Sequence, residues 1–406
     1  MDKKIKVGIL KETKTPPDRR TALAPELGDL FKQKFPDIDL VIQSSDNRCF
    51  TDDEYMEKGL TVVDDVSDCD ILIGVKEVKI DKLIPDKTYL FFSHTAKKQP
   101  YNRDLLRAFL DKNIHMVDHE YLTDKNNQRL VAFGYWAGLV GAYNGLLTYG
   151  KKYNLYDIKP ANKCHDLNEL NNELKKVKIN DPIKILITGG GRVAHGAMET
   201  LSKISNIKKI SAQQYLDNKF DYPVYAQIDP WDYAKRKDGS EFDLLHFFKH
   251  PDMYESTFLP YTKVTNMYIA CHFWDPKSPV FMTDDDLLAD DFLIDIIADV
   301  SCDIGKPIPS TIRASTIADP IYGYDPKTKS EVEPFAKGAI TVMAVDNLPG
   351  ELPRNASVDF GKGLIEKVYE SLFYDDKDGI IERASITKNG KLTAIFNYLQ
   401  DFVDGK

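Results

Sequence analysis

Cysteine is scarce in this sequence, and the few cysteines form no recognisable pattern. Five occur among 406 residues, scattered along the chain: Cys49, Cys69, Cys164, Cys271 and Cys302. There is no Cys-x-x-Cys pair, and no cysteines and histidines have the spacing of a zinc site. We therefore expect no bound metal, and reduced structural thiols as in a cytoplasmic protein.

Basic residues are fewer than acidic residues. The chain has 54 Lys and Arg against 63 Asp and Glu, which gives a formal net charge of −9 at pH 7. It has no basic stripe with interleaved aromatic residues, so we expect no nucleic-acid partner. Residues 1–10 lead directly into a strand-like run and lack the apolar core of a signal peptide.

One segment, Ala132–Tyr149, carries no charge over 18 residues. A bilayer-spanning helix needs about 20 predominantly apolar residues. Glycine, tyrosine and tryptophan interrupt this run, and strand-like segments flank it. Small residues let a buried helix pack closely against its neighbours. We predict a buried helix that connects two domains, and no membrane partner.

Short apolar runs alternate with helix-length segments along most of the chain, which is typical of parallel sheets covered by helices. The sequence therefore predicts an α/β protein. The first series of strands is expected at Val7–Leu10, Leu40–Gln43, Ile71–Val75, Tyr89–Phe92 and Ile114–Val117. The second is expected at Ile183–Ile187, Ile207–Ile210, Asn266–Ala270, Leu293–Asp299 and Ile340–Val345. Residues 212–261 lack clear periodicity and are interpreted as an insertion.

A glycine turn follows the first strand of the second series. The residues Gly189-Gly-Gly-Arg-Val-Ala194 fit the pattern G-x-G-x-x-A, with Arg192 and Val193 at its variable positions. Gly189 would form the tight turn, Gly191 would let the backbone approach a pyrophosphate, and Ala194 would allow close helix packing. The helix N-terminus would then face the phosphates. This context predicts a nicotinamide dinucleotide site.

The next strand-like run, Ile207–Ile210, ends at Ser211. An NAD site usually has an acidic residue there, which binds the ribose 2′-hydroxyl. Ser211 could instead accept the 2′-phosphate of NADP. The sequence therefore favours NADP(H) over NAD(H) slightly and leaves both open.

Polar side chains also follow strands of the first series. Lys76 follows Ile71–Val75 and His94 follows Tyr89–Phe92, at the strand ends where open α/β sheets place ligands. The two could share a proton-transfer site, or each could simply face solvent. Arg20, and Arg129 before the strand-like run Leu130–Phe133, could grip carboxylates or form surface ion pairs.

Several segments together resemble one enzyme family. They are Leu10-Lys-Glu-Thr-Lys14, Arg19-Arg-Thr-Ala-Leu-Ala-Pro25 and residues 85–95, 128–138, 298–305, 345–354 and 384–392. They are similar to the lysine–2-oxoglutarate reductase half of the bifunctional aminoadipic semialdehyde synthase. That family is related to the lysine-forming saccharopine dehydrogenases, to alanine dehydrogenase and to the transhydrogenase α-subunit. The similar segments run in order through nearly the whole chain.

The resemblance implies two Rossmann-like domains with parallel sheets and an active site in the cleft between them. A discontinuous substrate domain would comprise residues 1–135 and 346–406, and a dinucleotide-binding domain residues 136–345. The family joins the ε-amine of lysine to 2-oxoglutarate and reduces the imine with a nicotinamide cofactor to give saccharopine.

Residue roles are also implied by the resemblance. Lys76 matches the lysine that handles the proton of the secondary amine, and His94 matches the acid–base in carbinolamine formation. Arg20 and Arg129 match residues that hold substrate carboxylates. Asp346 would lie near the nicotinamide end of the cofactor, while Glu77 and Glu120 would tune the charge of the site.

Two other functions stay open on the sequence alone. One is an alanine dehydrogenase-like enzyme that acts on a small amino acid with ammonia. The other is a nicotinamide-binding sensor without turnover, although such a protein would not need to retain the set of Lys76, His94, Arg20 and Arg129. A homo-oligomer is possible in each case.

Overall fold

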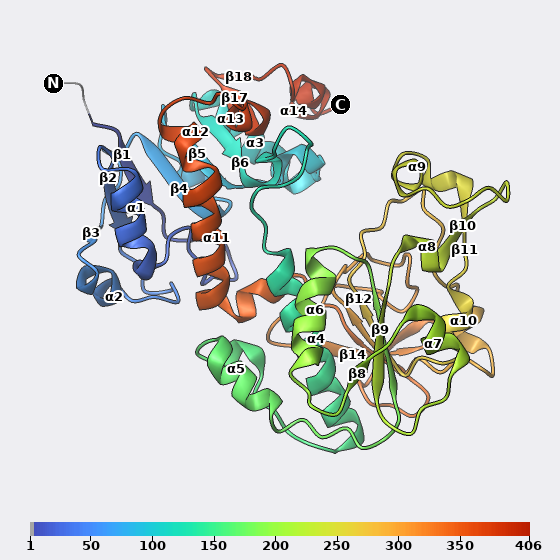
Figure 1. The fold of residues 1–406 in the computed structure, drawn as a ribbon. Coiled ribbons are helices and arrows are strands. Elements are labelled where there is room, and N and C mark those ends of the chain that lie inside the picture. The colour runs from blue at the N-terminus through green and yellow to red at the C-terminus, as the bar shows by residue number, and fades with distance from the viewer. Residues whose placement is uncertain (1–3) are drawn as a thin grey trace. The chain divides into compact units, whose positions relative to one another are not determined.

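The computed structural model describes residues 4–406, which form two compact units (Figure 1). One unit joins the chain up to Phe133 to Pro353–Lys406, and the other is Gly134–Leu352. Asp346 therefore lies in the second unit, whereas the sequence analysis grouped it with the first. Each unit contains an eight-stranded, mostly parallel sheet, which confirms the predicted α/β class.

The sheet of the first unit is completed by the C-terminal part of the chain. Its strand order is β18-β17-β6-β5-β4-β1-β2-β3, with β17 and β18 antiparallel to their neighbours. The strands are β1 (Lys6–Ile9), β2 (Asp39–Gln43), β3 (Thr61–Val63), β4 (Ile71–Lys76), β5 (Thr88–Phe92), β6 (His115–Asp118), β17 (Ser385–Lys388) and β18 (Lys391–Leu392).

Two hydrophobic clusters enclose this sheet. One includes Phe31 and Leu364, and the other includes Phe109 and Phe402, all at most 4% exposed. Burial of such a side chain stabilises the fold by roughly 1.5–3 kcal/mol. Both clusters therefore bind the C-terminal segment to the N-terminal sheet. The helices are α1 (Gly28–Lys34), α2 (Asp52–Glu57), α3 (Arg103–Asp111), α11 (Pro353–Lys367), α12 (Tyr369–Phe373), α13 (Ile380–Ala384) and α14 (Gln400–Asp404).

The strand expected at Leu130–Phe133 is wrong, because no strand forms there. The apolar side chains of this segment pack on helix α11 instead of forming part of a sheet. The ring of Phe133 stacks on that of Phe360, 4.4 Å between centroids, and Val131 is 4% exposed. The backbone of Arg129 forms an isolated antiparallel bridge with Thr123.

The second unit has the strand order β15-β14-β16-β13-β12-β7-β9-β8. Its sheet strands are β7 (Lys184–Thr188), β8 (Lys208–Lys209), β9 (Val224–Ile228), β12 (Met267–Ala270), β13 (Ile296–Asp299), β14 (Ile321–Asp325), β15 (Ser330–Val332) and β16 (Ile340–Met343). Its helices are α4 (Gly134–Tyr153), α5 (Leu167–Leu174), α6 (Arg192–Ser202), α7 (Ala212–Asp217), α8 (Pro230–Tyr233), α9 (Leu244–Lys249) and α10 (Leu259–Thr262).

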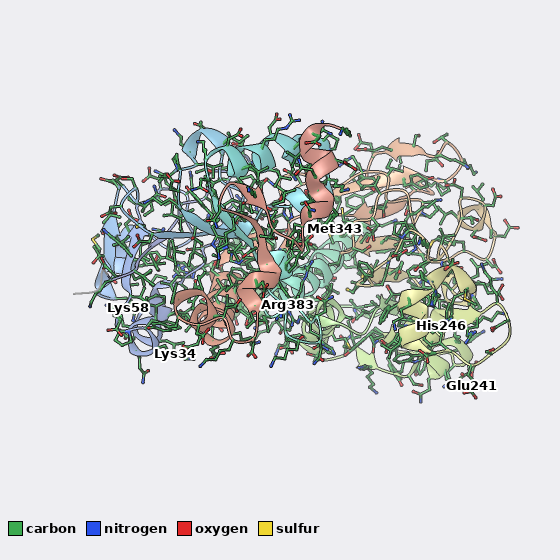
Figure 2. All side chains as sticks on the ribbon, turned by 90° about the horizontal axis from the view of Figure 1, so that it is seen from above. Lys34, Lys58, Glu241, His246, Met343 and Arg383 are labelled. Carbon is green, nitrogen blue, oxygen red and sulfur yellow. The ribbon has the colours of Figure 1, made fainter. Side chains whose placement is uncertain are left out.

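Residues 212–261 are more than an insertion, so that interpretation is wrong in part. They contain β9, which pairs with β7 over all five of its residues and separates β7 from β8. The remainder includes a two-stranded ribbon of β10 (Ala234–Arg236) and β11 (Tyr254–Ser256). Figure 2 shows Glu241 and His246 of this segment at the periphery of their unit.

The uncharged segment forms α4, which is buried along most of its length, as predicted. Its glycines permit close packing against α6. A Cβ built on Gly138 would lie 1.7 Å from the backbone oxygen of Val193, and one on Gly196 would lie 1.9 Å from that of Tyr135. The two helices therefore meet with their backbones almost in contact. Within residues 4–406 no helix has both the length and the apolarity to cross a membrane.

Candidate active site and cofactor turn

Four parallel strands of the first unit end side by side. The order β6-β5-β4-β1 places the carboxyl ends of these strands at one edge of the sheet. Lys76 is the last residue of β4 and is paired with Phe92 at the end of β5. His94 comes two residues after β5, and Glu120 two residues after β6. Adjacent strand ends thus bring Lys76, His94 and Glu120 to the same edge.

Lys76 is half-buried in an environment that disfavours its charged form. Burial lowers the pKa of Lys76 below its usual 10.5, and the cations of Arg20 and Lys14 lower it further. A neutral amine at this position is therefore more available near neutrality than on an exposed lysine. Lys14 also forms an ion pair with Glu77, 2.8 Å from Nζ to Oε1.

His94 has a backbone that its neighbours hold in place. Its φ of 55° lies in the left-handed region, which is uncommon outside glycine. The preceding Ser93 donates its N–H and hydroxyl to Asp118 Oδ2 at 3.0 and 2.5 Å. Asp118 Oδ1 accepts the N–H of Glu120 at 2.8 Å. One buried carboxyl therefore fixes the segments that carry both His94 and Glu120.

Glu120 is surrounded by cationic groups. Its carboxylate lies 2.6 Å from Arg129 Nη2 and 3.3 Å from Lys97 Nζ, and 3.7 Å from His94 Nδ1. Burial opposes ionisation, but His94, Lys97 and Arg129 together lower the pKa of Glu120 to about 2. Glu120 is thus anionic at neutral pH and balances the positive charge around His94.

Arg20 is buried and tightly paired, not presented alone at the surface. Its Nε and Nη2 donate to the two carboxylate oxygens of Asp18 at 3.0 and 2.6 Å. Its guanidinium lies over the ring of Phe133, 4.2 Å from the centroid. A bidentate pair of this kind orients the arginine. The carboxylate-binding roles of Arg20 and Arg129 stay predictions.

Sequence reasoning missed several polar residues at this edge. Asp118 is 0% exposed at the end of β6, Glu12 follows β1, and His119 is 0% exposed just after β6. The strand-end rule that identified Lys76 and His94 also applies to Glu12, Asp118 and His119. Burial lowers the pKa of His119 to about 4.

The glycine turn of the second unit has the geometry that a dinucleotide requires. Gly189 has a φ of +95°, and a Cβ there would lie 2.8 Å from the backbone oxygen of Cys271. Nothing lies within 4 Å of a Cβ built on Gly191, which is the N-cap of α6 and has no side chain to cap it. Buried Ala194 packs beneath the first turn of the helix. Open space beside uncapped N–H groups fits a pyrophosphate.

Two glycine substitutions should affect different properties, one the stability of the protein and the other its affinity for NADH. We expect Gly138→Ala to destabilise the protein by about 3 kcal/mol or more, because the new methyl group would overlap the Val193 backbone. Gly191→Ala should leave stability unchanged, since its Cβ enters open space, yet weaken NADH binding at least tenfold. Thermal unfolding and NADH fluorescence titration measure the two effects. Loss of stability without loss of binding in Gly191→Ala would contradict this assignment.

Ser211 follows the second strand of its unit, as expected, but that strand is not the neighbour of β7. It follows β8 at the edge of the sheet and caps α7, where its hydroxyl accepts the N–H of Gln214 at 3.2 Å. The strand beside β7 is β9, and Asp229 follows it directly. A Cβ built on Gly190 would lie 2.1 Å from Asp229 Oδ1. The carboxyl group of Asp229 thus lies against the glycine turn.

Three further predicted residues lie in the second unit. Arg192 is exposed at the start of α6, one residue beyond Gly191, and Val193 is half-buried beside it. Asp346 is exposed and follows β16, which lies in the same sheet as β7. All three follow carboxyl ends of parallel strands, the side of an open sheet on which ligands bind.

Comparisons with known proteins agree with this arrangement. Residues 8–140 match the family model "Alanine dehydrogenase/PNT, N-terminal domain". The alpha-aminoadipic semialdehyde synthase of Arabidopsis thaliana is 30% identical over 97% of this chain and 41% of its own length. A lysine-forming, NAD(+) saccharopine dehydrogenase of Yarrowia lipolytica is 25% identical over 90% of this chain and 92% of its own length.

The chain is a homologue of these two groups of enzymes. It spans less than half the length of the synthases that it matches, with 41% for the Arabidopsis protein and 46% for that of Rattus norvegicus. Among solved structures, an L-alanine dehydrogenase has a TM-score of 0.66 at 13% identity and covers 99% of both chains. A transhydrogenase from Sinorhizobium meliloti has a TM-score of 0.56 at 14% identity and covers 96% of this chain and 98% of its own. These two likenesses confirm the fold.

Proposed function

We propose that this homologue catalyses the nicotinamide-dependent condensation of L-lysine with 2-oxoglutarate to saccharopine, or the reverse reaction. The observation that carries the proposal is the edge of the first unit, where a lysine of lowered pKa lies on the strand adjacent to that of His94. Enzymes place an acid and a base of tuned pKa together at the site of proton transfer. The homology to lysine-forming saccharopine dehydrogenases supports the choice of reaction.

The chemistry needs two proton-transfer groups. The ε-amine of lysine must be neutral to attack the ketone, and the resulting carbinolamine must lose water to become an imine. His94, beside the anionic Glu120, serves as the acid–base in these steps. Lys76 handles the proton of the secondary amine. A nicotinamide cofactor held at the glycine turn would supply the hydride that reduces the imine.

The substrates bring three carboxylates, which require cationic partners at this edge. Arg20 and Arg129 are proposed to bind them, because a guanidinium holds a carboxylate through two parallel hydrogen bonds. In this structure the Nη2 of Arg20 donates to Asp18 Oδ2, and the Nη2 of Arg129 donates to Glu120 Oε1, at 2.6 Å in each case. Glu77 forms an ion pair with Lys14. Together with Glu120, it is proposed to limit the net positive charge of the site when no substrate is bound.

We propose that the cofactor is NAD(H) in preference to NADP(H), the reverse of the slight preference drawn from Ser211. Asp229 lies against Gly190, where an acidic side chain can accept hydrogen bonds from the adenosine ribose hydroxyls. A 2′-phosphate there would face the carboxyl groups of Asp229 and of Asp232, three residues further on. Asp346 is proposed to lie near the nicotinamide end.

We also propose a cytoplasmic location and a set of partners. All five cysteines are free thiols, which suits the reducing cytoplasm. A homo-oligomer remains compatible with the fold, and lysine, 2-oxoglutarate and saccharopine are the proposed small-molecule partners.

Oxidation of NADH with a panel of substrates tests the proposal. We expect turnover with lysine plus 2-oxoglutarate and much less with ornithine or ammonia as the amine. Turnover with pyruvate and ammonia but not with lysine would identify an alanine dehydrogenase-like enzyme instead. NADH binding without turnover on any pair would favour a sensor.

A further inference from the structure

Glu12 occupies an unusual position beside Lys76. It lies in the loop after β1, and its two carboxyl oxygens accept N–H groups from two successive residues of β4. Oε1 lies 2.7 Å from the nitrogen of Val75, and Oε2 lies 2.8 Å from that of Lys76. A single side chain therefore accepts the N–H groups of two successive peptide bonds, Gly74–Val75 and Val75–Lys76.

The end of β4 needs this support because its sheet pairing breaks there. Pairing with β5 runs regularly to Ile73 and Leu90, then shifts so that Lys76 lies opposite Phe92. Pairing with β1 ends at Ile9 and Ile73. An irregularity of this kind re-aims side chains and leaves backbone groups without ladder partners. The carboxyl group of Glu12 accepts the N–H groups of Val75 and Lys76 in place of a neighbouring strand.

A second side chain holds the same segment. His119 Nε2 lies 2.9 Å from the carbonyl oxygen of Gly74, and burial lowers the pKa of His119 to about 4. The imidazole is therefore neutral and donates its Nε2–H to that carbonyl. Gly74 also leaves room for Glu12, because a Cβ built there would lie 3.3 Å from Glu12 Oε1. Side chains thus support residues 74–76 where the ladder with β1 has ended and the ladder with β5 is irregular.

We propose that Glu12 is a positioning residue that holds the backbone of Lys76 so that its amine is aimed at the reacting nitrogen. The proposal rests on the proposed function, because it assumes that Lys76 is the acid–base. Glu12 does not need to touch substrate to act in this way. Misplacement of a catalytic group by about 1 Å can lower the rate on the order of 100-fold.

The positioning should depend on pH. Burial raises the pKa of Glu12 to about 8, against the opposing effect of the Val75 N–H, while Asp18 raises it further and Arg20 lowers it. Lys11, Lys14, Asp46, Asp64 and Lys79 line the same pocket as Glu12. Lys76 and Glu77 lie at the end of β4, and His119 is neutral. An ionised carboxylate accepts at both oxygens, whereas the neutral acid carries a hydroxyl donor. The two N–H groups are therefore held more firmly above about pH 8.

Glu12→Gln tests the proposal, because the amide keeps the shape and replaces one acceptor with a donor. We expect kcat to fall roughly 10- to 100-fold, the rise of kcat through about pH 8 to disappear, and NADH binding to stay within twofold of wild type. Glu12→Asp should retain that pH-dependent rise at a lower kcat. Thr13→Ala is the matched control, since Thr13 Oγ1 accepts only the N–H of Lys79, at 3.0 Å, and it should keep wild-type kcat.

A second readout is independent of turnover. Trace acetylation with peptide mapping reports the reactivity of Lys76 at each pH, and we expect Glu12→Gln to change it several-fold while Lys82 is unchanged. Wild-type kcat, pH profile and Lys76 reactivity in Glu12→Gln would overturn the proposal. The proposal would also be overturned if the NADH affinity and the unfolding temperature of Glu12→Gln fell together with kcat, because that result would mark a structural role. If wild type fails on lysine plus 2-oxoglutarate, the proposed reaction fails, and the labelling still decides on Glu12.

Discussion

Replacement of Lys76 by methionine should lower kcat for the oxidation of NADH with lysine and 2-oxoglutarate by about 10³-fold. A positioned acid–base group contributes on the order of 10²–10⁴ to the rate, and methionine keeps the length of the side chain without its proton. The affinity for NADH should not change, because Lys76 belongs to the first unit and the glycine turn to the second. Steady-state kinetics and fluorescence titration give the two values.

Lys82→Met is the matched control for this substitution. Lys82 is an exposed lysine of the same unit, with 64% of its side chain accessible, so the variant should keep full activity. A Lys76→Met protein with a normal kcat would remove Lys76 from the mechanism. A protein that has lost NADH binding in the same proportion as kcat would assign Lys76 a structural role instead.

Replacement of Asp229 by serine should reduce the preference for NADH over NADPH at least 100-fold. Two effects combine: loss of the acceptor for the ribose hydroxyls weakens NADH binding, and removal of the negative charge admits the 2′-phosphate of NADPH. Like charges at a binding interface cost several kcal/mol, and each 1.4 kcal/mol corresponds to about a tenfold change. The ratio of kcat/KM for the two cofactors measures the preference directly.

Ser211→Ala tests whether Ser211, and not Asp229, determines the cofactor preference. Ser211 caps helix α7 beyond the edge strand, so its loss should leave the cofactor ratio unchanged. A wild-type enzyme that prefers NADPH, with a preference that Ser211→Ala abolishes and Asp229→Ser does not alter, would restore the interpretation drawn from the sequence.

The contrast between Ser211 and Asp229 shows where reasoning from the sequence ended. The fingerprint from β7 into α6 was visible because a buried strand, three glycines and a helical pattern follow one another. The order of strands in the sheet was not visible. β8 follows α6 in the chain but pairs only with β9, so the next strand in sequence is not the next strand in space. β9 is a short, largely apolar run, Val224–Ile228, that was not recognised within a long stretch without clear periodicity.

The acid–base edge was predictable to a different extent. Lys76 and His94 follow strongly apolar strands, so the strand-end rule found them without knowledge of the fold. The supporting carboxyls of Glu12 and Asp118 could have been found by the same rule. Their function depends on the broken pairing at Ile73 and on the left-handed backbone of His94, neither of which leaves a mark in the sequence.

We propose above that this chain joins lysine to 2-oxoglutarate and reduces the product with a nicotinamide cofactor. The most direct test is mass spectrometry of the product formed from lysine, 2-oxoglutarate and NADH deuterated at C4. We predict saccharopine that carries one deuterium on the carbon derived from the ketone. Absence of saccharopine, together with deuterated alanine formed from pyruvate and ammonia, would contradict the proposed reaction.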